Sequence, residues 1–191
     1  MKTKSFWAGI CLLILSGCGP MVGGMMVASN GVKDFKVLQG TLTDLSTGSR
    51  VAVLGPFDKT PEAFYICRGE EAAAFTSAFN QSGLFAAELA IDTRFPDELP
   101  QAHQFKGRTE EELQKALGLK QVPELIMSGT ILSREMVAAP ANGVIMTAAY
   151  RLEFLNLSNG QTTVIEVTAK ELFQDVVPKT VAHLAKQMGG R

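Results

Sequence analysis

Hydrophobic and polar side chains alternate along residues 144–157 of the chain, "VIMTAAYRLEFLNL". Side chains two residues apart share one face of a β-strand, so the pattern predicts a strand with one buried face. The side chains expected on that face are Val144, Met146, Ala148, Tyr150, Leu152 and Phe154. Asn159 and Gly160 then form a dipeptide typical of a tight turn, and residues 162–173 return as the second strand of a hairpin.

Three shorter apolar runs predict further strands. They are residues 49–57, 85–92 and 124–133. The first run, which a Gly-Pro pair interrupts, is expected to be buried on both faces. Residues 36–45 alternate less regularly and predict an edge strand, and residues 134–143, "REMVAAPANG", are expected to be a short turn.

A helical pattern follows the first apolar run. Thr60 can cap such a helix and Pro61 suits its first position. Gly69 weakens the pattern, so the helix begins either at Thr60 or only after Gly69. Gly83 is expected to end it.

Two more helices complete the pattern. Thr109 and Glu112 form a capping box at the start of the clearest one, and Gly118 ends it. Residues 178–188 place their apolar side chains on one side and predict the last helix. We therefore expect an α/β (α+β) fold: a mixed sheet of about five strands with three helices, in the order β-α-β-α-β-β-β-α.

The first 17 residues have the layout of a secretory signal peptide. Lys2 and Lys4 precede an apolar stretch of about ten residues, whereas a transmembrane helix needs about 20. Residues 15–18, "LSGC", resemble a lipobox, the bacterial lipoprotein signal in which the cysteine is acylated and becomes the first mature residue. Cys18 is accordingly the predicted lipid attachment site; the alternative is an ordinary secreted protein in which Cys18 is incidental.

Acylation of Cys18 would hold the protein at a bilayer. One fatty acyl chain gives only marginal binding, whereas two or more, such as palmitate, hold a protein durably. Resemblance to the lipoprotein sorting rule implies the outer membrane, facing the periplasm, because Gly19 rather than aspartate follows the cysteine. Cleavage before Cys18 also leaves 16 basic against 19 acidic residues.

The chain then divides into three parts: a signal peptide over residues 1–17, an acylated cysteine and tether over residues 18–35, and one periplasmic domain over residues 36–191. Residues 19–31, "GPMVGGMMVASNG", are uncharged and rich in glycine and methionine. Two interpretations stay open for them. They are a flexible tether, or their Met and Val side chains lie against the bilayer or a neighbouring subunit.

The charge balance excludes one class of partner. The formal net charge of the whole chain is −1, so no surplus of cations is available to neutralise phosphates. We therefore expect no nucleic-acid partner.

Residues suited to catalysis are sparse in this sequence. The two histidines are His103, expected to be solvated after a proline-rich loop, and His183, expected to be packed or on the surface of the last helix. We find no zinc-ligand spacing, nucleophile elbow or phosphate-binding loop. We expect no catalytic residue, metal site or cofactor, and hence no enzyme.

Cys67 is the one thiol left after acylation of Cys18, because Cys11 lies inside the signal peptide. In an oxidising compartment three roles stay open for it. It is buried and inert, it bridges two subunits, or it is a nucleophile assisted by His183.

Several segments, taken in order, resemble a known superfamily. They are "RVAVLGPF", "SGLF", "ALGLKQVPELIMSGTI" with its Gly129, "YRLEFLNLSNGQTT" and "VPKTVAHLAKQM". The superfamily includes the curli secretion lipoprotein CsgG, the amino-terminal domain of TolB, the activator LpoB and the Pel secretion lipoprotein PelC. The resemblance implies an envelope protein that acts by binding and assembly. The curli channel needs long amphipathic hairpins, and the predicted 134–143 turn is too short to supply them.

The expected function is that of a lipid-anchored subunit of an outer-membrane secretion or envelope-assembly apparatus, which binds envelope proteins and self-associates. The alternative is a lipoprotein activator of a periplasmic cell-wall enzyme. That alternative favours a long linker, whereas only about a dozen residues follow Cys18, a reach of about 40 Å when extended.

Overall fold

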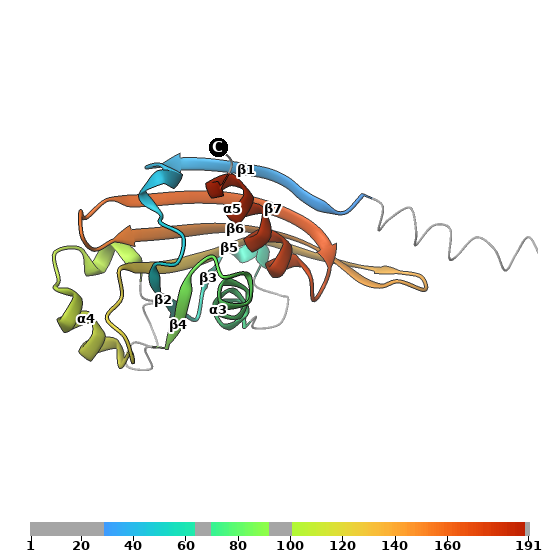
Figure 1. Ribbon diagram of the computed structural model, residues 1–191. Helices are drawn as coiled ribbons and strands as arrows, with labels where there is room; N and C mark the ends of the chain where they lie inside the picture. Colours follow the sequence, from blue (N-terminus) through green and yellow to red (C-terminus); the bar gives the residue numbers. More distant parts are fainter. Residues whose placement is uncertain (1–28, 64–69, 92–100, 190–191) are drawn as a thin grey trace, which may run out of the picture.

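The computed structural model describes residues 29–63, 70–91 and 101–189. In this part of the chain seven strands form one open sheet, in the order β1-β7-β6-β5-β2-β4 with β3 beside β5 (Figure 1). The strands are β1 Gly31–Gln39, β2 Arg50–Gly55, β3 Asp58–Lys59, β4 Ala86–Ile91, β5 Leu125–Ala139, β6 Gly143–Asn156 and β7 Thr162–Leu172. Pairing is antiparallel from β1 to β5 and parallel from β5 through β2 to β4, so the sheet is mixed.

Three α-helices and three short 3₁₀ turns connect the strands. They are α3 Glu71–Ser82, α4 Glu110–Leu117 and α5 Val176–Gly189, with η1 Leu42–Asp44, η2 Pro61–Ala63 and η3 Ala102–Phe105. The predicted α+β class, with a mixed sheet and three helices, is confirmed. The sheet has seven strands where about five were expected. The edge strand predicted over residues 36–45 is β1, which lies earlier in the chain, and the two-residue β3 was not predicted. Because β1 begins at Gly31, residues 31–35 lie in a strand rather than in the tether.

The helix ends follow from local chemistry. At the start of α4 the Thr109 hydroxyl accepts a hydrogen bond from the Glu112 amide at 3.3 Å, and the Glu112 carboxylate accepts one from the Thr109 amide at 3.1 Å. Gly118, in the left-handed region at φ 66°, ends this helix, so the predicted capping box and stop are confirmed. Helix α3 begins at Glu71, as the shorter of the two alternatives predicted.

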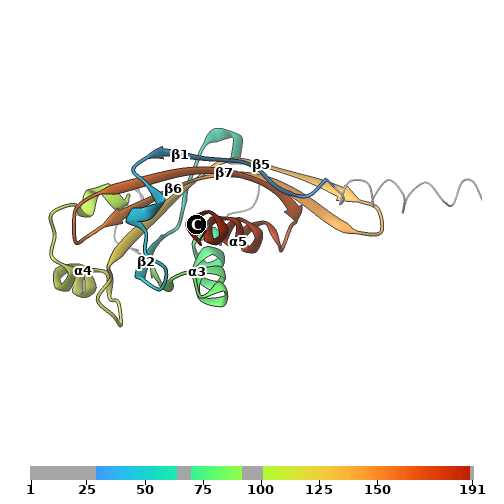
Figure 2. The same cartoon turned by 45° about the horizontal axis from the view of Figure 1, so that its top comes forward.

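The helices cover the two faces of the sheet unequally. Helices α3 and α5 lie side by side on one face and enclose the larger core (Figure 2). Helix α4 and η3 cover one end of the opposite face, where Leu113 packs with Ile126 and Leu155. Elsewhere that face is polar, and Arg151 pairs with Glu166 at 2.6 Å. An antiparallel sheet tolerates this arrangement, since one of its faces can be solvated.

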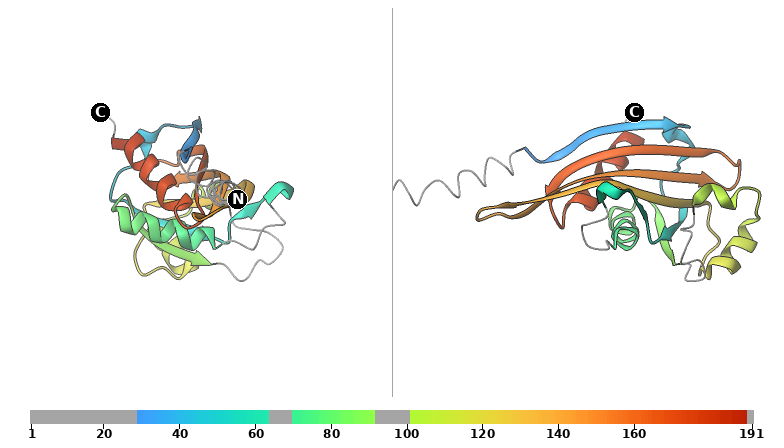
Figure 3. Two further views of the ribbon diagram at one scale, coloured as in Figure 1. Left: turned by 90° about the vertical axis from the view of Figure 1, so that its right-hand side faces the viewer. Right: turned by 180° about the vertical axis from the view of Figure 1, so that it is seen from behind.

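The β5–β6 hairpin corrects a sequence prediction. The expected turn over residues 134–143 instead continues β5 as far as Ala139, with Arg134 opposite Ala148 and Met136 opposite Met146. Only residues 140–142 form the turn. Strand pairing overrides the local pattern here, because each added residue joins the ladder already formed with β6. The hairpin consequently projects beyond the helices (Figures 1 and 3).

Among the glycines of the described residues, Gly129 on β5 has the least room for a side chain. A Cβ atom at Gly129 would lie 2.4 Å from the Phe57 ring, which follows β2 and is buried. Phe57 in turn packs on Phe75 of α3, with ring centroids 5.6 Å apart. The missing side chain at Gly129 therefore lets Phe57 link β5 to the helical layer.

We expect Gly129→Ala to lower the free energy of unfolding of the mature chain by about 2 to 3 kcal/mol, because the added methyl overpacks against Phe57. Urea titration measures this change. Gly189→Ala is the matched control, since nothing lies within 4 Å of a Cβ at that position. Equal effects of the two substitutions would contradict the packing argument.

Candidate functional site

The sequence-predicted residues do not converge on one site. Cys18 and Cys67 lie outside the described residues, so their predicted roles stay predictions. His183 on α5 packs against Phe35 of β1, with ring centroids 5.3 Å apart, and its Nε2 lies 3.1 Å from the Gln187 amide nitrogen. It is thus a half-buried, packed imidazole.

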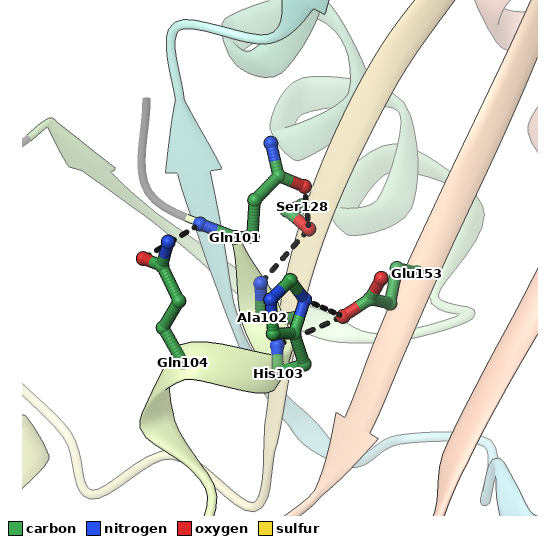
Figure 4. Close-up of polar contacts among 6 residues, drawn as sticks. All are labelled: Gln101, Ala102, His103, Gln104, Ser128 and Glu153. Atoms are coloured by element: carbon green, nitrogen blue, oxygen red, sulfur yellow. Dashed lines mark hydrogen bonds and ion pairs between the residues drawn. The ribbon is translucent and has the colours of Figure 1, made fainter. Parts of the chain in front are cut away.

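His103 lies in a polar cluster where η3 meets the sheet (Figure 4). Its backbone N–H donates to the Glu153 carboxylate at 2.8 Å, and its Nδ1 lies 3.2 Å from the same oxygen. Ser128 is opposite Glu153 in the β5–β6 ladder. The Ser128 hydroxyl accepts a hydrogen bond from the Ala102 amide at 3.0 Å and donates to Gln101 at 3.4 Å.

Ser128, His103 and Glu153 therefore lie close together, but their hydrogen bonds have the geometry of a structural contact between η3 and the sheet. Ser128 is buried, and its hydroxyl is bonded to the η3 segment rather than to the histidine. A nucleophile must contact its base and be reachable by substrate. His103 has an exposed side chain, as predicted, and the cluster holds η3 against the sheet.

A second feature is a groove of about 970 Å³ between α3, the projecting part of the β5–β6 hairpin and the start of α5. We call it the hairpin groove. Its apolar walls are Ala74, Ala78, Met136, Val144, Phe173 and Val177. Among these, the large side chains of Met136, Val144 and Phe173 are exposed. Exposed apolar side chains gathered around a concave site indicate a place where another apolar group binds.

A buried ion pair lies at the floor of the hairpin groove. Glu71, the first residue of α3, accepts a hydrogen bond from the Arg134 guanidinium, and both side chains are almost fully buried. The Nε of Arg134 also lies 3.1 Å from the sulfur of Met146. The amino terminus of α3 further favours the negative charge of Glu71. The pair thus ties the helix to the hairpin.

Two buried oxygens at this floor have no hydrogen-bond partner among the described residues. They are the Tyr150 hydroxyl and the second carboxylate oxygen of Glu71. Burial, aided by the charge of Glu71 and opposed by that of Arg134, raises the pKa of Tyr150 far above its ordinary value. The phenol therefore keeps its proton. Both oxygens are enclosed by neighbouring side chains, so they lie beneath the surface of the groove and are not available to a molecule bound in it.

The sequence pattern revealed only part of this groove. Tyr150 is on the buried face of its strand, as predicted. The sequence pattern places Arg134 in the short turn expected over residues 134–143, and its partner Glu71 is 63 residues away, beyond the range of any local pattern. A charged residue between the apolar run of 124–133 and the next apolar residues was the single available indication.

Two features are absent from the described residues, a membrane-spanning helix and a metal-binding cluster. None of the helices there is long and apolar enough to cross a membrane. The same part of the chain holds no group of three or more histidine, cysteine or acidic side chains arranged to bind a metal ion.

We expect Arg134→Met to cost about 3 to 5 kcal/mol of unfolding free energy, because it leaves the Glu71 carboxylate buried without its cation. The double variant Glu71→Leu, Arg134→Met should lose less than the single variant, since both charges are then absent. Urea unfolding of the wild type, both single variants and the double variant gives the coupling energy. Additive losses would show that the two side chains do not act as a pair.

Comparison with known proteins gives structural similarities, two of which are described here. No protein-family model and no curated protein matches the chain. A variant PelC dodecamer from Paraburkholderia phytofirmans has a TM-score of 0.49 and 13% identity, over 83% of this chain and 100% of that one. A second PelC dodecamer from this organism also has a TM-score of 0.49 and 13% identity, over 81% of this chain and 98% of that one. Similarity at this level establishes no family and assigns no role to any residue.

Proposed function

We propose that this chain is a lipid-anchored periplasmic protein of the bacterial outer membrane. It acts by binding other proteins, as a self-associating subunit of a secretion or envelope-assembly apparatus. The observation that carries the proposal is the lipobox of residues 15–18, placed at the end of a short apolar stretch. Acylation of Cys18 would commit the domain to a membrane surface.

The position of β1 supports a domain held close to that membrane. About a dozen residues separate Cys18 from Gly31, where β1 begins, and fully extended they span at most about 45 Å. Strand β1 begins at the end of the molecule from which the β5–β6 hairpin projects (Figure 1). The anchor would therefore keep the hairpin end nearest the bilayer, and a partner would have to meet the protein there.

The surface supports binding rather than catalysis. The exposed apolar side chains of the described residues include Met136, Val137 and Val144 on the hairpin and Phe173 beside it. Apolar patches of this kind favour contact with another protein surface. Ser128, His103 and Glu153 hold η3 against the sheet, so we do not assign them a catalytic role.

We expect Cys18→Ala to abolish acylation, so that the protein is either left as the uncleaved precursor or recovered in the soluble fraction. Membrane fractionation combined with intact mass measurement distinguishes these forms from the acylated protein. Cys11→Ala is the matched control, because that cysteine is removed with the signal peptide. A Cys18→Ala protein of mature mass that stays as firmly membrane-bound would overturn the proposal.

We also expect the detergent-solubilised mature protein to sediment as an oligomer, because the projecting apolar hairpin is suited to contact with a second copy. Analytical ultracentrifugation measures the mass. Val144→Glu, a charged substitution at an exposed hairpin position, should shift it toward the monomer. A wild-type protein that is monomeric at all concentrations tested would contradict the self-association part of the proposal.

A further inference from the structure

Strand β1 forms an open edge of the sheet in the part of the chain that the structure describes. It pairs with β7 on one side and has no strand on the other (Figure 1). No backbone hydrogen bond from another element reaches its outer side among the described residues. Such a row of unpaired N–H and C=O groups is a template for one more strand.

The opposite edge of the sheet is capped. It is formed by β4, and the side chain of Asn80 on α3 bonds to the backbone of this strand. The Asn80 amide donates to the Ala87 carbonyl at 2.8 Å, and the Ala87 N–H donates to the Asn80 side-chain oxygen at 2.9 Å. The carboxamide thus takes the place that a neighbouring strand would fill at Ala87. Strand β1 has no such cap among the described residues, so β1 is the edge that a partner strand can join.

The charges of β1 are arranged symmetrically about its middle residue. Asp34 and Lys36 flank Phe35, which is the fifth of the nine residues Gly31–Gln39. Phe35 contacts His183 of α5, so Asp34 and Lys36 lie on the other face of the strand. Both are exposed and form an ion pair at 2.5 Å. An aspartate and a lysine on either side of a central residue make the strand complementary to an antiparallel copy of itself.

One register of two antiparallel β1 strands overlaps all nine residues, and in it Phe35 lies opposite Phe35 of the second copy. This register places Asp34 opposite Lys36 of the other copy, twice by symmetry. It also uses the regular stretch Asp34–Val37, which lies between the two bulges of the ladder with β7. Centring the pair on Asp34 or on Lys36 instead would place like charges opposite each other. Because opposite charges across strands stabilise pairing and like charges oppose it, overlap and charge select the same register.

We propose that β1 pairs antiparallel with β1 of a second copy about a two-fold axis at Phe35, a pairing that rests on the self-association proposed above and names a surface for it. The two sheets join into one, and the outer backbone groups of both strands gain partners. The exposed side chains of Val37 and Leu38 lie against the second strand. Each copy uses the same surface, so the contact closes at two copies. The β5–β6 hairpin lies elsewhere in the fold and can join such pairs into larger oligomers.

The pair is compatible with two lipid anchors in one bilayer. The two Gly31 residues lie at opposite ends of the paired strands, about 26 Å apart, because eight steps of about 3.3 Å separate them. The dozen or so residues before each Gly31 reach at most about 45 Å. Both acylated cysteines therefore reach the same membrane when the strands lie along its surface. Each hairpin then lies at the end where its own anchor enters the bilayer.

Charge reversal tests the pairing in the detergent-solubilised mature protein. We expect Asp34→Lys and Lys36→Asp each to raise the dissociation constant of the pair about tenfold, because each places like charges opposite each other at two positions. Both side chains are exposed, so the fold tolerates these substitutions. Analytical ultracentrifugation over a concentration series measures the dissociation constant. An unchanged constant in both variants would overturn the proposal.

Mixing the two variants separates a contact between copies from the ion pair within one chain. An Asp34→Lys chain has two positive charges on this face of β1, and a Lys36→Asp chain has two negative ones. A pair of unlike chains regains both contacts across the strands, whereas neither chain regains its internal ion pair. We expect the equimolar mixture to associate with the wild-type dissociation constant. A mixture as weak as the separate variants contradicts the pairing.

Two exposed residues of α4 supply the matched control. Glu111→Lys and Lys115→Glu change the net charge by the same amounts as the β1 substitutions. We expect each of these variants, and their mixture, to associate as the wild type does. Effects equal to those of the β1 variants would indicate a general attraction between oppositely charged chains and would overturn the proposal.

Hydrogen exchange separates failure of this proposal from failure of the proposed function. We expect the amides of residues 31–39 to exchange more slowly as the protein concentration rises, whereas those of residues 86–91, on the capped edge, do not change. A wild-type protein that is monomeric at all concentrations tested overturns both the self-association and the pairing. A wild-type oligomer that Val144→Glu dissociates, with the β1 amides unprotected, overturns the β1 pairing alone.

Discussion

Strand β5 is the constraint on which the rest of the structure depends, because it joins the two halves of the sheet. It pairs in parallel with β2 on one side and antiparallel with β6 on the other. Ser128 on this strand accepts a hydrogen bond from η3, and Gly129 leaves room for the Phe57 ring. Arg134 forms the ion pair with Glu71 at the start of α3. One strand thus positions elements on both faces of the sheet, and its extension to Ala139 creates the wall of the groove.

The buried ion pair between Glu71 and Arg134 fixes the shape of the groove. Removing Glu71 and Arg134 from water is costly, and their mutual attraction offsets the cost only while the geometry holds. Each end of the pair belongs to a different element, so the pair fixes α3 relative to the hairpin. The second Glu71 oxygen, like the neutral Tyr150 hydroxyl, has no hydrogen-bond partner among the described residues. The ion pair therefore both holds α3 against the hairpin and keeps this carboxylate oxygen buried.

How much of the structure the sequence predicts depends on how far apart in the chain the interacting residues lie. The Thr109–Glu112 capping box depends on four consecutive residues, and it was predicted with its stop at Gly118. The buried face of β6 depends on alternation within one strand and was predicted as well. The Arg134–Glu71 pair and the His103–Glu153 contact join residues 63 and 50 positions apart. The hairpin extension depends on pairing with a neighbouring strand rather than on the pattern within one strand. A local sequence pattern does not encode such contacts. It placed Arg134 in a turn, whereas pairing with β6 makes Arg134 a buried strand residue.

The proposed anchor connects the fold to function. In a lipoprotein the distance between lipid and domain decides which partners can be met, because the anchor confines the search to a thin layer at the membrane. About a dozen residues separate Cys18 from the start of β1. Strand β1 begins at the end of the molecule from which the β5–β6 hairpin projects, so the apolar hairpin would be the part of the domain that meets a partner in that layer.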